Sequence, residues 1–138
     1  MAVVEFALLA HAAQVSSDQL ISMLGGGWDT GEVPEEAYPL NVVLSVVFRV
    51  AFEADEEGKT HAGEVAVEQV NGEPLATVTF TVGVQRGDEE LPPGWKRNAA
   101  LVMAVPVQFP GPGFYAVSIT VAGSRLKTIP LRMKVAGA

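Results

Sequence analysis

Residues 117–135 read VSITVAGSRLKTIPLRMKV, and this stretch decides the fold class. In its first part apolar residues take every second position, at Val117, Ile119 and Val121. The same alternation resumes from Ile129 to Val135. A period of two is typical of strands with one buried face, so we expect a β-hairpin that turns at Gly123-Ser124. Because Pro130 cannot donate a ladder hydrogen bond, its strand is predicted to lie at a sheet edge or to carry a bulge.

Similar patterns predict strands along most of the chain. They cover residues 3–15, 20–24, 38–52, 61–70, 75–84 and 100–109. Asn71-Gly72 predicts a two-residue hairpin turn, because both central positions of a type I′ turn need positive φ. Seven or eight strands with turns at this spacing predict an all-β fold, an antiparallel β-sandwich that is immunoglobulin-like or C2-like. Pro112-Gly113-Phe114-Tyr115 is where the tyrosine corner of an immunoglobulin-like sandwich would lie.

The composition describes one acidic domain over residues 1–138. The chain has 138 residues, 49% of them hydrophobic, which excludes a disordered protein and fits a single core. Sixteen acidic and nine basic residues give a net charge of −7, which argues against a nucleic-acid partner. The absence of cysteine excludes disulfides and thiol catalysis, and it suits a reducing compartment.

Two apolar segments resemble export or membrane signals without meeting their requirements. Met1 to Ser17 lacks the basic region of a signal peptide. The uncharged run from Asn98 to Ser124 is interrupted by the prolines and glycines of residues 106–113, so two strands explain it better than a spanning helix. We therefore expect a soluble cytoplasmic protein without a membrane partner.

Several short motifs resemble one known family. They are FALL at residues 6–9, AAQV at 12–15, LGGGWD at 24–29, NG at 71–72 and FPGPGFY at 109–115. On these motifs the chain resembles a family of short actinobacterial β-sandwich proteins of unknown function. The resemblance covers nearly the whole chain and implies a stand-alone sandwich without an assigned activity, and it transfers no catalytic residue.

Catalytic patterns are absent, so we predict no enzyme and no cofactor. Gly25-Gly26-Gly27 is not followed by a phosphate-binding lysine and is best explained as a turn that orients Trp28. The acidic segment 53–64 has partial EF-hand spacing, which leaves a weak calcium site as an alternative. Its ligands would be Glu53, Asp55, Glu57 and Glu64.

Two groups of residues are candidates for binding. Trp28, with Asp29 beside it, and Trp95 lie in or beside predicted loops, where they would either bind a ligand or cover the open ends of the sandwich. Residues 1–90 carry a net charge of −13 and residues 91–138 carry +6, and the last hairpin holds a basic cluster. Its members are Arg125, Lys127, Arg132 and Lys134. This cluster either binds an acidic partner or a second copy, or protects an exposed strand edge from aggregation.

Two function classes follow. The first is a non-catalytic interaction or structural module that docks an unknown protein partner, or itself as a homo-oligomer, through a sheet edge or face. The alternative is a carbohydrate-binding sandwich that uses Trp28 and Trp95, with calcium at the acidic segment. We favour the first because no export signal is recognisable.

Overall fold

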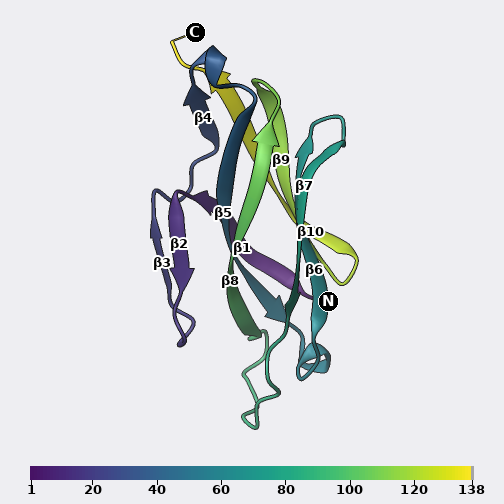
Figure 1. Ribbon diagram of the computed structural model, residues 1–138. Helices are drawn as coiled ribbons and strands as arrows, with labels where there is room; N and C mark the ends of the chain where they lie inside the picture. The colour runs from purple at the N-terminus through teal and green to yellow at the C-terminus, as the bar shows by residue number, and fades with distance from the viewer. Residues whose placement is uncertain (138) are drawn as a thin grey trace.

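The computed structural model describes residues 1–137, in which two β-sheets pack face to face (Figure 1). The three-stranded sheet has the order β1 (Val3–Ala10), β5 (Leu40–Phe52), β8 (Arg97–Phe109). The five-stranded sheet has the order β4 (Thr30–Val33), β10 (Ser124–Val135), β9 (Gly113–Val121), β6 (His61–Gln69), β7 (Pro74–Val82). A separate hairpin, β2 (Ala12–Val15) and β3 (Ile21–Leu24), stands at the side of the sandwich. Two 3-10 turns complete the chain, η1 (Glu35–Ala37) and η2 (Ala54–Glu56).

One core lies between the two sheets, and it confirms the predicted β-sandwich. Its largest fully buried side chains come from both layers and include Phe48, Phe52, Phe109, Leu9, Ile119 and Leu131. On β9 and β10 the alternating apolar positions that the sequence indicates include Val117, Ile119, Ile129 and Leu131, and all four are buried; Ser118, on the opposite face of β9, is buried as well. Burial of such side chains is the main favourable term in folding, at about 1.5–3 kcal/mol each.

The structure has ten strands, two more than the eight expected segments. The run predicted over residues 3–15 is divided at His11, whose backbone N–H donates to the carbonyl of Leu24 and so directs β2 into its own hairpin. The second addition is β4, which pairs in parallel with the end of β10 through Arg132 to Val135. The four residues of β4 show no alternating apolar pattern, and the strand that they pair with lies far along the chain. The sequence alone therefore does not predict β4. All other strand pairs are antiparallel.

Two of the predicted turns are wrong in detail. Around Asn71-Gly72 only Gly72 has a positive φ, and the N–H of Gln69 donates to the carbonyl of Glu73, so the turn is longer than two residues. The two-residue turn with both φ values positive is Ala122-Gly123, at 52° and 81°, rather than Gly123-Ser124. The type I′ geometry therefore occurs where no Asn-Gly signal exists.

The position of Pro130 agrees with its sequence prediction. In β10 the ladder with β4 begins only at Arg132, so the side of Pro130 that faces away from β9 has no strand partner within residues 1–137. A register shift also interrupts the β9–β10 ladder between Arg125 and Lys127. The strand thus has both a free edge segment and a bulge, the two situations that tolerate proline.

Candidate functional site

The candidate site begins with Phe114 at the start of β9. Strand alternation turns Tyr115 into the core and Phe114 outward, so that 63% of the Phe114 side chain is exposed. The phenol of Tyr115 donates a hydrogen bond to the carbonyl oxygen of Gly111, four residues upstream. This contact is the predicted tyrosine-corner bond, and it fixes the turn that presents Phe114.

The neighbouring strand places a guanidinium on that exposed ring. Arg132 of β10 is the register partner of Phe114, and its guanidinium carbon lies 5.2 Å from the ring centroid. Such a cation–π contact stabilises an exposed arginine by about 0.5–1 kcal/mol and keeps its N–H groups free for a ligand. Arg132 has no ion-pair partner within residues 1–137.

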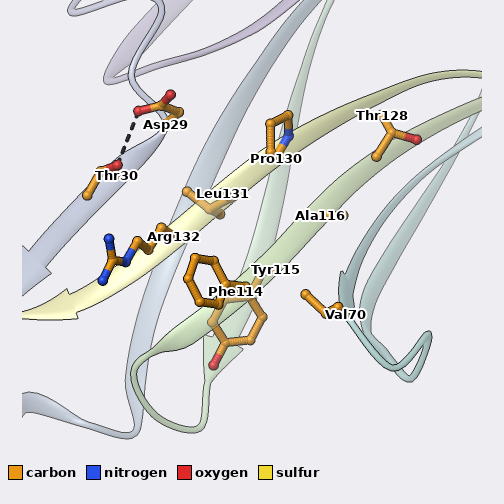
Figure 2. A pocket seen from close by; sticks show the side chains of 10 residues that line it. All are labelled: Asp29, Thr30, Val70, Phe114, Tyr115, Ala116, Thr128, Pro130, Leu131 and Arg132. Atoms are coloured by element: carbon orange, nitrogen blue, oxygen red, sulfur yellow. Dashed lines mark hydrogen bonds between the residues drawn. The ribbon is translucent and has the colours of Figure 1, made fainter.

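A groove with a volume of about 670 Å³ lies along this outer face of the five-stranded sheet. Figure 2 shows Phe114 between Arg132 and Val70, with Pro130 and Thr128 along β10. The complete lining of this sheet-face groove is Asp29, Thr30, Val70, Phe114, Tyr115, Ala116, Thr128, Pro130, Leu131 and Arg132. It combines an apolar floor with one guanidinium and one carboxylate.

The sheet-face groove brings together two of the predicted binding residues, Asp29 and Arg132. The backbone carbonyl of Asp29 accepts a 2.8 Å hydrogen bond from the N–H of Arg132, which attaches the start of β4 to β10. The Asp29 carboxylate accepts a hydrogen bond from the hydroxyl of Thr30 at 3.2 Å. Both side chains border the groove from adjacent strands.

The other basic residues of the last hairpin are engaged differently. Arg125 pairs with Glu68 at 2.9 Å, and the same carboxylate accepts a hydrogen bond from the buried Ser118 hydroxyl. Lys134 pairs with Glu32 of β4 at 3.5 Å. Lys127 is exposed and has no ion pair in the described residues. The predicted cluster is therefore divided into two paired cations and two cations available to a partner.

The same pairing extends beyond the hairpin and accounts for much of the charge segregation. Four of the six bases in residues 91–138 bind carboxylates of the first ninety residues: Lys96–Glu53, Arg97–Glu57, Arg125–Glu68 and Lys134–Glu32. Folding brings basic side chains of residues 91–138 into contact with acidic side chains of residues 1–90. Most of the positive charge of residues 91–138 is thus neutralised by carboxylates of the same chain.

Trp28 is not an exposed binding aromatic. Gly27, with a φ of 89°, donates its N–H to the carbonyl of Leu9, and this turn directs the Trp28 ring against the core. The indole Nε1 is buried without a hydrogen-bond partner. The expectation that the glycine run orients Trp28 is therefore confirmed, whereas its side chain covers the core instead of offering a surface for a ligand.

Trp95 lies in a separate part of the molecule. It belongs to the loop that connects β7 to β8, and 69% of its side chain is exposed. No residue lines both the sheet-face groove and the pocket beside Trp95. Trp28 instead lies beside Leu9 and the His11 ring, and it does not line the pocket of Trp95, so the two tryptophans do not form one platform.

The acidic segment 53–64 does not gather its carboxylates. Glu53 pairs with Lys96 and Glu57 pairs with Arg97, while Glu64 lies exposed on β6 beyond η2. Asp55 lies within η2. Among residues 1–137 no group of three or more histidine, aspartate or glutamate side chains is arranged to hold a metal ion. The EF-hand spacing is thus realised as a capped 3-10 turn whose flanking residues, Glu53 and Glu57, form ion pairs with Lys96 and Arg97.

Sequence reasoning missed the apolar part of the site. The sequence pattern gives Val70 only as part of a strand, Pro130 only as the mark of a sheet edge or bulge, and Phe114 only as a neighbour of the tyrosine corner. A usable signal exists in the sequence, because Phe114 alternates with the buried Tyr115, and Val70 is a large apolar residue beside the Asn71-Gly72 turn. These residues meet in one groove because β10, β9 and β6 are neighbours in the sheet. The sequence does not give this strand order.

The comparisons with known proteins complete this description. A family model described as a family of unknown function (DUF6941) matches residues 5–134. No curated protein matches the sequence. Among solved structures, a beta-glucuronidase from glycoside hydrolase family 2 matches with a TM-score of 0.49 and 13% sequence identity. The match covers 69% of this chain and 10% of that chain, so the present chain spans about a tenth of the enzyme's length.

Proposed function

We propose that this chain, which belongs to the family of unknown function DUF6941, is a non-catalytic interaction module that docks another protein at its sheet-face groove. In this proposal residues 1–138 act as one sandwich domain in the cytoplasm. That the chain comes from an actinobacterium is a separate prediction from the sequence. No helix in residues 1–137 has the length and apolar character to cross a membrane.

The observation that carries the proposal is the exposed Phe114 beneath Arg132. Solvent-facing positions of a sheet are ordinarily polar, yet this face presents Phe114 and, across the groove, Val70 with 73% of its side chain exposed. Aromatic and arginine side chains supply most of the binding energy of protein interfaces. A contiguous apolar patch with a polar rim is typical of a docking surface.

The charge pattern indicates the chemistry of the partner. Arg132 has no carboxylate partner in the described residues, and Lys127 on the same strand has none either. A partner segment with an apolar side chain for the space between Phe114 and Val70, and a carboxylate for Arg132, would satisfy the groove. Such charge complementarity also accelerates association.

A photo-crosslinking experiment tests this proposal. A p-benzoylphenylalanine residue replaces Phe114 in one variant and Thr79 in a control, since Thr79 is exposed on β7 of the same sheet and lies outside the groove. Irradiation in the native cytosol is expected to produce one protein adduct from position 114 and none from position 79. Adding Arg132→Ala to the first variant is expected to reduce the adduct at least about tenfold, as for a loss of about 1.4 kcal/mol.

Three results would contradict the proposal. They are no adduct at position 114, the same adducts at both positions, or an adduct that Arg132→Ala leaves unchanged. An adduct with twice the mass of the chain would identify a second copy as the occupant and replace the separate partner by a homo-oligomer. Carbohydrate binding through Trp28 and Trp95 together receives no support, because Trp28 packs against the core.

A further inference from the structure

A second concave site lies at the end of the sandwich opposite the sheet-face groove. The groove lies near the start of β9, which follows the end of β8, whereas the loop of residues 83–96 lies beside the beginning of β8 (Figure 1). A pocket with a volume of about 340 Å³ lies between this loop, the end of β5 and η2. We call it the Trp95 pocket, and its principal lining residues are Phe52, Glu57, Arg86, Glu89, Trp95 and Arg97.

A buried ion pair fixes one wall of the Trp95 pocket. The Glu57 side chain is only 6% exposed, and its two carboxylate oxygens accept from Nη1 of Arg97 at 3.0 and 3.3 Å. Nη2 of the same guanidinium donates to the carbonyl of Glu89 at 2.6 Å. A Cβ at Gly87 would lie 2.2 Å from Nη2, so a larger residue at position 87 would displace the guanidinium from this position. Arg97 therefore holds the loop in a defined position despite the cost of desolvating both charges.

An exposed aromatic ring and an unpaired cation complete the pocket. The Trp95 side chain is 69% exposed beside this wall, and an indole has both an apolar face and a polar edge. Arg86 has no ion pair within residues 1–137 and contributes hydrogen-bond donors. Glu89 and Glu90 contribute acceptors from the same loop.

The mixture of charges selects the class of ligand. Because Arg97 and Glu57 neutralise each other, the free charges of the lining are Arg86, which disfavours a cation beside it, and the carboxylates of Glu89 and Glu90, which disfavour an anion. A neutral molecule with several hydroxyl groups uses both the donors and the acceptors, and its C–H face packs on the indole. The volume lies at the small end of the range for ligand sites.

From this arrangement we propose that the Trp95 pocket binds a neutral sugar ring. The ring stacks on Trp95, and its hydroxyl groups accept from Arg86 and donate to the carboxylates of Glu89 and Glu90. The site is independent of protein docking at the sheet-face groove. It requires neither Trp28 nor a metal ion.

Saturation-transfer NMR on the intact chain tests the proposal. The probes are the methyl glycosides of glucose, galactose, mannose and N-acetylglucosamine, each at about 5 mM, because a small open pocket predicts a Kd in the millimolar range. At least one is expected to receive saturation, strongest at the ring protons that face the indole. Trp95→Ala is expected to weaken that binding at least tenfold, and Arg86→Ala severalfold, while Thr79→Ala, at an exposed position outside the pocket, leaves it unchanged. Circular dichroism shows whether each variant is folded.

Charged analogues test the choice of a neutral ligand. Glucosamine and glucuronate place a cation or an anion on the same ring, and both are expected to bind more weakly than the neutral sugars. The proposal is overturned if none of the neutral glycosides binds, if Trp95→Ala binds them as well as the unmodified chain, or if either charged analogue binds more tightly. Crosslinking at position 114 is unaffected by any of these results, so the two proposals fail separately.

Discussion

At the scale of single residues, the phenol of Tyr38 links stability to pH. Its hydroxyl donates a 2.9 Å hydrogen bond to the carbonyl of Lys134, and burial, with a smaller contribution from the Tyr115 phenol, raises the pKa of Tyr38 above its ordinary 10.0. A pKa that is higher in the folded state means that the folded chain holds the proton more tightly. The stability that neutral Tyr38 contributes is therefore complete below pH 10.0 and is lost as the pH rises through the folded-state pKa.

Tyr38→Phe measures this contribution. Below about pH 9 the variant is expected to be less stable than the unmodified chain by about 1 kcal/mol, the usual value of one hydrogen bond. Above the ordinary pKa of 10.0 the difference is expected to shrink, because only the unmodified chain has a phenol to ionise at this position. Urea unfolding at several pH values gives the two curves. Parallel curves across this range would show that Tyr38 is not the linked group.

At the scale of elements, the turn between β9 and β10 carries a residue that does not suit it. Ala122 has a φ of 52° and Gly123 a φ of 81°, and a left-handed conformation costs an alanine about 1–2 kcal/mol. Ala122 is exposed, so another side chain meets no steric obstacle. Ala122→Asn creates the preferred Asn-Gly turn and is expected to raise the free energy of unfolding by about 1 kcal/mol in urea titrations.

A β-branched residue at the same position provides the opposing control. Ala122→Val is expected to lower the free energy of unfolding, because a branched Cβ is least compatible with positive φ. If the asparagine variant were no more stable than the valine variant, the turn would not have the proposed strain. Gly72 is an unsuitable site for this test, because its turn is longer than two residues.

The elements also show where sequence reasoning stops. Alternation within a strand is local, so the last hairpin, the buried face of β9 and the tyrosine corner at Tyr115 follow from the sequence directly. Contacts between distant segments do not: β4 is a strand because the end of β10 lies beside it, and His11 ends β1 because Leu24 accepts its N–H. The candidate site follows the same rule. The sequence predicts Asp29 and Arg132 as separate binding residues. Their position with Val70 in one groove depends on the strand order β4-β10-β9-β6.

At the scale of the whole molecule, charges that are far apart in sequence neutralise one another. Most bases of the final third of the chain pair with acids from the first ninety residues, so much of the positive charge of that third is neutralised within the molecule. The exposed pairs among them, such as Lys96–Glu53 and Lys134–Glu32, contribute only about 0–1 kcal/mol each. Their larger effect here is on association, because a paired cation is a weak attractor for a second copy.

The isolated chain is therefore expected to be a monomer at every ionic strength. A net charge of −7 makes copies repel one another, and repulsion is strongest at about 0.01 M salt, where the screening length is about 30 Å. Light scattering after gel filtration at about 0.01 M and about 1 M salt should give the mass of one chain in both cases. A larger mass at low salt that falls at high salt would mean that Lys127 and Arg132 hold an acidic surface of another copy. Lys127 and Arg132 are the members of the basic cluster that have no ion pair in residues 1–137, and Lys59 and Arg86 outside the cluster have none either. Lys127→Ala with Arg132→Ala would then restore the monomer, whereas Lys59→Ala, which also removes an exposed unpaired cation, would not.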